Sequence, residues 1–327
     1  MMQFGIYPGG AAGADAGRLV AGNPDDPDRI VTALNRIDGQ APDGLLVRAY
    51  TWFRDETGSD GTDIIHPSHA DQLLGARRRF DLVVQYQSSR GDVDGYARFV
   101  RNVVRRYGHL TAALQITEEP NVTGNALLDG AYPRVLEAIV QGAAAAREEA
   151  RQAGWTDIRI GLNTTPLFGP SSSFLSDLAA VGGTALRDSL DYIGLDMFPD
   201  VFVPVADGDI RKATRDLLAW HRRDRLEPAG LGHLPLHITE HGWPTGPGRS
   251  AARQAVVLRD VIETVLELAD DLRIAAYELF SLRDADSSGD SPFHHFGIMT
   301  DDYVPKPAFD VFRSLVEQRG VRSASAL

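Results

Sequence analysis

The stretch ALQITEEPN, residues 113–121, runs through a mostly apolar segment and ends on two glutamates and a proline. A second stretch, LHITEHGWP at residues 236–244, has the same form and ends on Glu240 and a Gly-Trp-Pro turn. Each indicates a short strand that stops at a polar turn, because β-branched and apolar residues favour strands and Gly, Pro and Asn favour turns. Similar short runs alternate with segments of helical period along the rest of the chain.

The alternation can be counted, and eight strands and eight helices result. We predict strands at residues 3–7, 44–51, 81–87, 111–117, 158–164, 192–198, 236–240 and 274–280. We predict helices at residues 28–37, 68–78, 93–107, 132–153, 174–187, 209–225, 251–272 and 306–318. Strands that alternate with helices build a parallel sheet, and eight such units close into a (β/α)8 TIM barrel.

We therefore expect one catalytic barrel over residues 1–327, with a frayed tail at about residues 319–327. The loops that follow strands are long and polar, notably residues 53–66, 165–173, 199–208 and 282–304. The length and polarity of the loops that follow strands predict an active site at the carboxyl ends of the strands. A doubly wound open sheet is the alternative, but no GxGxxG or P-loop pattern follows a predicted strand.

Composition excludes several classes of function. The formal net charge of -12 disfavours a nucleic-acid partner, since binding of phosphates needs a basic patch. No apolar run approaches 18 residues, so no membrane association is expected. The chain has no cysteine, which excludes thiolate catalysis and Cys-ligated metals. No signal peptide is visible, and the protein is expected to be cytoplasmic if Met1 is the native start.

The ends of the fourth and seventh strands carry the candidate chemistry. Glu118 and Glu119 end one strand, and Glu240 ends the other. Two carboxyl groups in one cavity suit the cleavage of a glycosidic bond, because one protonates the leaving oxygen and the other attacks or shields the sugar carbon. This reaction needs no metal or organic cofactor, and none is expected.

Several motifs resemble those of one superfamily. TEEPN is similar to the acid/base segment on strand four of clan A glycoside hydrolases, and TEHGWP to their nucleophile segment on strand seven. Arg48 in VRAY, GLDMFP at residues 194–199 and the closing segment HFGIMTDDYVPKPAFDVF also resemble that superfamily. The resemblance implies a retaining glycosidase with Glu119 as acid/base and Glu240 as nucleophile, their carboxyl groups about 5 to 5.5 Å apart. Arg48 would keep Glu240 ionised.

Three positions depart from the superfamily pattern. Glu118 stands where an asparagine usually contacts the sugar, and its charge would raise the pKa of Glu119. Because neighbours on a strand point to opposite faces, the sequence leaves open whether Glu118 or Glu119 faces the cavity. Phe198 replaces a tyrosine common near the nucleophile, and strand eight offers Tyr277 or Phe280 where a tryptophan is usual.

A set of residues at or near strand ends is predicted to bind the substrate. Its members are Arg48, Glu118, Asn163, Asp196, Phe198, His241, Trp243 and Tyr277. Aromatic rings here, Tyr50 and Trp52 among the further candidates, suit stacking on sugars, but rings that pack under loops give the same pattern. Buried polar residues that close a barrel layer likewise resemble hydroxyl-binding residues.

Two other classes of function stay open. One is a catalytically impaired carbohydrate-binding barrel, in which the Glu118, Phe198 and Phe280 departures have removed turnover. The other is a metal-dependent hydrolase that uses Glu118, Glu119, His241 and the late His294 and His295, although a solvated loop explains those histidines better. The leading hypothesis is a glycosidase or transglycosidase acting on an oligosaccharide, polysaccharide or glycoconjugate. Sugar, anomer, acceptor and oligomeric state are not determined by the sequence.

Overall fold

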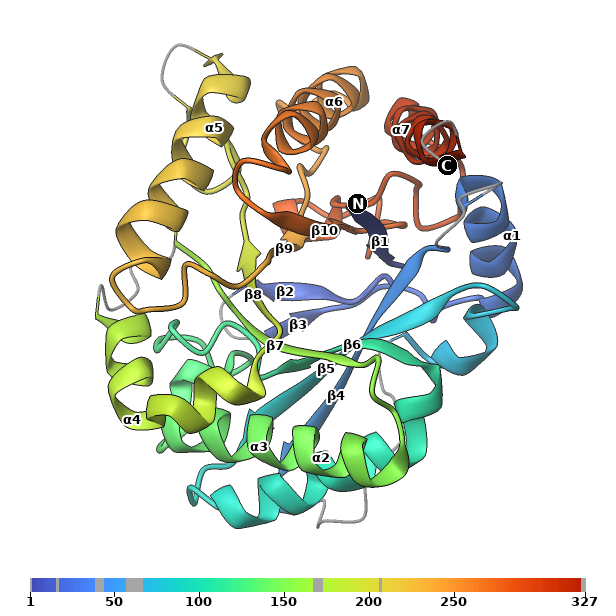
Figure 1. Cartoon of the computed structure of the whole chain (residues 1–327). Coiled ribbons are helices and arrows are strands. Elements are labelled where there is room, and N and C mark those ends of the chain that lie inside the picture. The colour runs from blue at the N-terminus through green and yellow to red at the C-terminus, as the bar shows by residue number, and fades with distance from the viewer. Residues whose placement is uncertain are drawn as a thin grey trace.

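A computed structural model describes residues 2–15, 18–38, 44–56, 67–166, 173–205 and 208–324. Eight parallel strands close into a barrel in the order β1-β10-β9-β8-β7-β6-β5-β4, and β4 pairs back onto β1 (Figure 1). The strands are β1 (Gln3–Tyr7), β4 (Leu46–Arg54), β5 (Arg79–Gln87), β6 (Thr111–Ile116), β7 (Arg159–Thr164), β8 (Tyr192–Asp196), β9 (Leu236–His241) and β10 (Ile274–Phe280). The predicted (β/α)8 fold and all eight predicted strands are confirmed.

Helices surround the barrel on the outside (Figure 1). They are α1 (Pro27–Asp38), α2 (Val93–Tyr107), α3 (Val135–Ala153), α4 (Phe174–Ser189), α5 (Ile210–Trp220), α6 (Ala251–Leu268) and α7 (Pro307–Ala324). Seven of the eight predicted helices therefore exist. The sixth continues beyond Trp220 as a π-helical segment, η5 (His221–Leu226). The last continues to Ala324, into the segment that we expected to be frayed.

The predicted helix at residues 68–78 is wrong. Only a short 3-10 helix, η1 (Ala70–Leu73), forms there. His69 before it has φ 56° and Gly75 after it has φ 57°, and a left-handed residue at each end leaves no room for a longer helix. Leu73 and Leu74 still bury their side chains, so the segment keeps the apolar contacts that suggested a helix.

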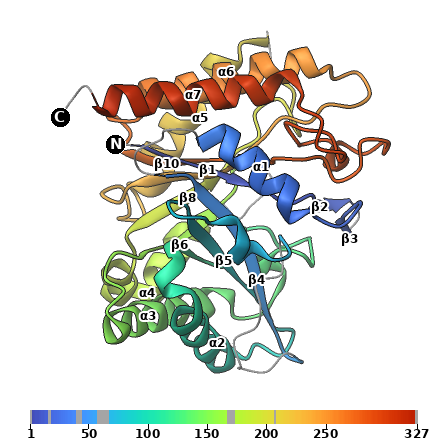
Figure 2. The same ribbon diagram turned by 90° about the vertical axis from the view of Figure 1, so that its right-hand side faces the viewer.

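A two-stranded antiparallel hairpin was not predicted. It consists of β2 (Ala12–Asp15) and β3 (Arg18–Val20), directly after β1. Because it follows a barrel strand, it lies at the carboxyl end of the barrel, next to the long loop after β10 (Figure 2). Both segments stand where the sequence predicts the active site.

The main core lies between the outer face of the barrel and the helices. The contact between barrel and α7 illustrates it: the ring of Phe4 on β1 lies 5.9 Å from Tyr277 on β10 and 5.9 Å from Phe312 on α7. All three side chains are almost fully buried. Alternate strand residues thus face the helices, and the others face the barrel interior. In the described ranges, no helix has the length and apolar character that a membrane crossing requires.

Replacing Phe312 by alanine should destabilise the fold, because it opens a cavity between α7 and the barrel. We expect a loss of about 3 to 5 kcal/mol in the free energy of unfolding, the usual cost of truncating a buried phenylalanine. Urea denaturation followed by circular dichroism measures it. Val304→Ala, at a side chain that is 58% exposed, is the control and should change stability by less than about 0.5 kcal/mol. Equal effects of the two variants would contradict the packing described here.

Candidate active site

The guanidinium of Arg48 lies at the centre of a buried polar network in the barrel. Arg48 is on β4, and its side chain points inward, where it is fully buried. It lies 2.9 Å from Asp81, 3.1 Å from Gln115 and 3.2 Å from Glu118. Its Nε lies 3.4 Å from a carboxylate oxygen of Glu240. Strands β4, β5, β6 and β9 are thereby connected through one cation.

Tyr50 reaches the same carboxylate from β4. Its hydroxyl accepts a hydrogen bond of 2.7 Å from Arg48 Nε and donates a short one to Glu240 Oε1. The sequence predicts Tyr50 only as a ring for stacking, and Phe198 lacks the hydroxyl that the resemblance leads one to expect near Glu240. The structure supplies that hydroxyl from a different strand. The signal was the spacing of two residues from Arg48, which puts both side chains on one strand face.

Glu118 and Glu119 both line the cavity, which resolves the question of which one faces it. Successive residues of a strand point to opposite faces, but this rule does not apply to Glu118 and Glu119, because β6 ends at Ile116. Thr117 has φ 69° and Glu119 has φ 41°, so the backbone turns through left-handed conformations as it leaves the barrel. Two successive side chains are thus directed to one side.

The two glutamates differ in how firmly they are held. Glu118 accepts hydrogen bonds from Gln115 at 2.7 Å and from Asn163 at 3.3 Å, in addition to its contact with Arg48. For Glu119 it is the backbone amide, not the carboxyl, that bonds Asn163: the N–H donates to Asn163 Oδ1 at 2.9 Å. Within the described ranges, no protein group hydrogen-bonds its carboxyl. The Glu119 carboxyl is therefore open to the cavity, whereas Glu118 is fixed by its partners.

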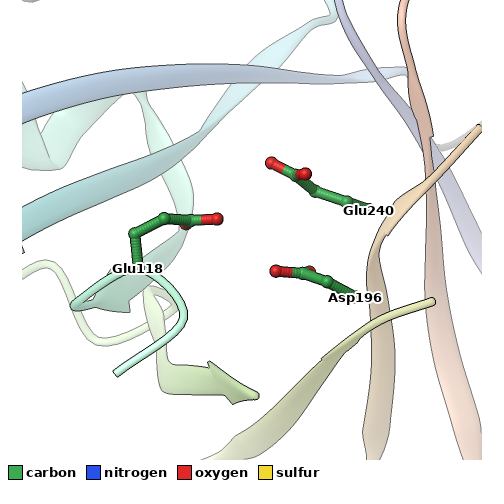
Figure 3. Close-up of side chains that lie close together, drawn as sticks. All are labelled: Glu118, Asp196 and Glu240. Atoms are coloured by element: carbon green, nitrogen blue, oxygen red, sulfur yellow. The ribbon is translucent and has the colours of Figure 1, made fainter. Parts of the chain in front are cut away.

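Asp196 lies beside these residues and completes a cluster of three carboxylates. It accepts hydrogen bonds from Thr239 at 2.6 Å and from Asn163. One oxygen each of Glu118, Asp196 and Glu240 lies within 4.8 Å of the others, and Figure 3 shows the three side chains pointing toward one another. Asn163 and Asp196 do not line the cavity, so they orient the carboxylates rather than reach the open space.

Burial and mutual repulsion raise the pKa values of these acids. Desolvation, with repulsion from Glu240, raises the pKa of Glu118 to about 8. Desolvation and the charges of Glu118 and Glu240 raise the pKa of Glu119 well above its ordinary value. Desolvation also raises the pKa of Glu240, but Arg48 and the Tyr50 hydroxyl oppose the shift. The site therefore favours a protonated Glu119 beside a more acidic Glu240.

The same charges act on Arg48. Burial alone would lower the pKa of its guanidinium, but Tyr50, Glu118, Asp81 and Glu240 around it raise that pKa well above the ordinary value. Arg48 thus remains a cation at every pH at which the protein is folded. It supplies the positive charge that allows an ionised carboxylate to exist in this buried position.

Besides Arg48, Asn163 and Asp196, three further residues predicted to bind substrate do not line the cavity. His241 and Tyr277 are buried and contact each other, with 2.6 Å between Nδ1 and the hydroxyl oxygen, and burial lowers the pKa of His241 to about 3. They belong to the layer between barrel and helices. Trp243 is also buried, and its Nε1 lies 3.3 Å from Asp200. A residue at a strand end can point into the cavity or toward the helices, and its spacing in the sequence does not reveal which.

The late histidines do not join the carboxylates. His295 Nε2 lies 2.6 Å from the Gly289 carbonyl, and Asp284 of the same loop forms an ion pair of 2.7 Å with Lys306. Among the described residues, the only group of three potential metal ligands is Glu118, Asp196 and Glu240. It contains no histidine, so the ligand set imagined for a metal-dependent hydrolase is not assembled.

The cavity above the carboxylates has a volume of about 440 Å³. Glu118, Glu119 and Glu240 line it together with Phe198, which was predicted to bind substrate. The carboxyl ends of β1, β4, β5, β6 and β10 and the segments beyond them supply most of the remaining lining. This is the end of the barrel at which (β/α)8 enzymes carry their active sites.

Comparison with solved structures defines the class of fold. No family profile and no curated protein sequence matches the chain. The structural neighbours are (β/α)8 glycoside hydrolases of clan A, which confirms the resemblance at the level of the fold. Identities of 13% to 15% do not assign the chain to one family.

Three neighbours illustrate how much of each protein the match covers. A family 39 glycoside hydrolase from Bacteroides cellulosilyticus WH2 has 15% identity and a TM-score of 0.61 over 96% of this chain and 63% of its own. A β-glucuronidase from Faecalibacterium prausnitzii has 13% identity and a TM-score of 0.57 over 90% of this chain and 46% of its own. The chain therefore spans less than two thirds of these two proteins. A β-glucosidase from Exiguobacterium marinum matches nearly end to end, with 14% identity and a TM-score of 0.61 over 97% and 98% of the two chains.

Replacing Glu118 by glutamine should change how stability depends on pH. Because the pKa of Glu118 is raised from 4.5 to about 8, the folded state holds a proton that the unfolded state has lost. Protonated Glu118 contributes its full stabilisation at pH values below the pKa of the unfolded state. This contribution is lost as the pH rises through the pKa of the folded state. Glutamine does not titrate, so the variant should gain stability relative to the native protein as pH rises across that window.

Urea denaturation of both proteins at about pH 5 and pH 9 measures this difference. The control is Glu317→Gln on the exposed surface of α7, which should show no such trend. If the stability difference between Glu118→Gln and the native protein were the same at both pH values, the protonated state of Glu118 described here would be wrong.

Proposed function

We propose that the protein is a retaining glycosidase or transglycosidase, with Glu240 as nucleophile and Glu119 as acid/base. One observation carries the proposal: two carboxyl groups line the same cavity, one held by a cation and a hydroxyl, the other without a protein hydrogen-bond partner among the described residues. The glycosidase fold of the structural neighbours supports a carbohydrate substrate. No cofactor has a part in this chemistry.

In the first step, Glu240 attacks the anomeric carbon of the sugar. Tyr50 and Arg48 both contact Oε1, so Oε2 is the oxygen available for attack. A bond forms between Oε2 and the carbon as the bond to the leaving oxygen breaks. The proton of Glu119 passes to that leaving oxygen, and the products are a glycosyl ester on Glu240 and a free alcohol.

In the second step, Glu119 acts as a base. Now ionised, it takes a proton from water, whose oxygen attacks the anomeric carbon and releases Glu240. A sugar hydroxyl in place of water completes a transglycosylation by the same transfers. The raised pKa of Glu119 suits both roles, since it holds the proton in the first step and takes one back in the second.

Glu118 gives the site a feature of its own. Its carboxyl stands in the position of the superfamily asparagine, between Arg48 and Asn163. Its protonated form can donate a hydrogen bond to a sugar hydroxyl, as an amide does. Its ionised form, in turn, raises the pKa of Glu119 by repulsion. We infer that Glu118 combines substrate binding with adjustment of the neighbouring acid.

Glu240→Gln should abolish turnover, and Glu119→Gln should reduce kcat by about 10²- to 10⁴-fold, the usual contribution of a general acid/base. The reduction of kcat in Glu119→Gln should be smaller for 4-nitrophenyl glycosides than for glycosides with a poorer leaving group, because 4-nitrophenolate needs little protonation. A panel of 4-nitrophenyl glucosides, glucuronides and related sugars of both anomers supplies the substrates. Glu317→Gln is the control.

Proton NMR of the first-formed product checks the stereochemistry. Retention of the anomeric configuration is expected, and inversion would contradict the nucleophile assigned to Glu240. Sugar binding without turnover, unaffected by Glu240→Gln, would instead identify a carbohydrate-binding barrel. Undiminished activity of Glu240→Gln would overturn the proposed mechanism as a whole.

Tyr50→Phe should displace the acidic limb of the kcat/KM profile to higher pH, because loss of the hydroxyl removes an interaction that lowers the pKa of Glu240. We expect kcat/KM to fall roughly 10- to 100-fold, the equivalent of losing a hydrogen bond to a charged group. Tyr86→Phe is a matched control, since its hydroxyl bonds the Pro133 carbonyl, at 3.0 Å. An unchanged pH profile for Tyr50→Phe would rule out this positioning role.

A further inference from the structure

The cavity has two unlike walls. Strands β4 and β5 and the segment after β6 supply the polar side chains Arg54, Gln85, Gln87 and Asn125, set among the apolar Trp52, Val122, Leu127 and Leu128. The segment after β8, the end of β10 and the loop beyond it supply five phenylalanines: Phe198, Phe202, Phe280, Phe293 and Phe296. We call these five rings the phenylalanine wall. The side-chain amides and the guanidinium of the lining thus come from other strands and segments than those that supply the phenylalanines.

The phenylalanine wall is one continuous surface. Phe296 lies at its centre, with ring centroids 5.6 Å from Phe198, 5.6 Å from Phe280 and 6.2 Å from Phe293. Phe202 extends it, at 5.7 Å from Phe198 and 5.8 Å from Phe293. Because each ring packs on at least two others, the wall is formed before any ligand binds.

The geometry of the wall differs from that of a platform for a sugar. A sugar stacks on one flat aromatic face and directs its hydroxyls to polar groups at the edge. Here Phe198 and Phe296 meet at 74°, and Phe280 and Phe296 also at 74°. Rings set on edge to one another make a concave apolar surface. A hydroxyl buried against it would lose its hydrogen bonds to water and find no polar partner in return.

The opposite wall is preorganised for polar contacts. Gln85 and Gln87 both donate to the Leu127 carbonyl, at 3.0 and 3.1 Å, and Arg54 Nε donates to Gln87 at 3.0 Å. The guanidinium of Arg54 also lies 4.6 Å from the ring of Trp52. These amides and the guanidinium are held in place in the lining of the cavity that the carboxylates also line.

The apolar surface continues to the mouth of the cavity. Leu19 on the β2–β3 hairpin lines the cavity and is 42% exposed. The hairpin contacts η6 (Pro292–His294), the short helix that carries Phe293, and both stand at the carboxyl end of the barrel (Figure 2). An apolar group that filled the cavity would cover Leu19 and Phe293 together.

From these observations we propose that the substrate is a glycoside of a single sugar with an aryl or alkyl aglycone. The sugar faces the polar wall and the carboxylates, and the aglycone packs against the phenylalanine wall. This inference rests on the proposed glycosidase function. The volume of about 440 Å³ is in the range of pockets that bind one compact ligand rather than a polysaccharide chain.

The kinetic test compares the methyl and n-octyl glycosides of the sugar that is turned over best in the 4-nitrophenyl panel. Both release a simple alcohol, so their leaving groups are equally reactive and only the apolar contact differs. We expect kcat/KM to be at least about 10-fold higher for the octyl glycoside, since each buried methylene favours binding. Phe293→Ala should reduce that octyl-to-methyl ratio several-fold. Val203→Ala, at an exposed position near the wall, should leave the ratio unchanged.

A binding test needs no turnover. The neutral fluorophore N-phenylnaphthylamine should bind Glu240→Gln with enhanced emission, and n-octyl β-D-glucoside but not methyl β-D-glucoside should displace it. The double variant Phe202→Ala/Phe293→Ala should weaken fluorophore binding at least about 10-fold. Circular dichroism of each variant shows whether the barrel is intact.

The outcomes separate the two proposals. Turnover with an octyl-to-methyl ratio near one, or with faster cleavage of cellobiose than of the octyl glycoside, overturns the substrate class and leaves the glycosidase proposal standing. Fluorophore binding at the wall without turnover of any glycoside overturns the glycosidase proposal and with it the substrate class, but supports an apolar ligand at this surface. If neither turnover of a glycoside nor fluorophore binding is observed, both proposals are wrong.

Discussion

The buried guanidinium of Arg48 is the interaction on which the rest of the site depends. Asp81, Glu118 and Glu240 all lie within 3.4 Å of it, and Tyr50 adds a hydroxyl. More acids surround this cation than one positive charge can neutralise. The consequence is a set of shifted pKa values, with protons retained on some carboxyls and repulsion that the barrel must hold in place.

The fold supplies the rigidity that this repulsion requires. The acids come from different strands of a closed barrel, and Asn163 and Thr239 hold Asp196 from the neighbouring strands. The backbone turn at Thr117 and Glu119 then leaves one carboxyl outside the network. Carboxyl groups with shifted pKa values in one cavity are typical of functional sites.

Sequence reasoning was most successful where a single element decides the structure. The eight strands followed from runs of apolar residues bounded by turns, and β1 and β10 have the predicted limits. The helix predicted at residues 68–78 failed because left-handed residues at His69 and Gly75 outweighed its apolar spacing. The β2–β3 hairpin was missed because its strands are short and carry no alternating pattern.

For the site, the sequence by itself determined which strands end in carboxylates, and it therefore predicted that Glu240 meets Glu118 or Glu119 at one end of a barrel. Only the tertiary structure decided what each side chain faces. It directed Tyr50 to Glu240, buried His241 and Tyr277 behind the barrel wall, and gathered five phenylalanines on one side of the cavity. The physical reason is that strand spacing is local, whereas the direction of a side chain at a strand end depends on backbone turns and on neighbours distant in the chain.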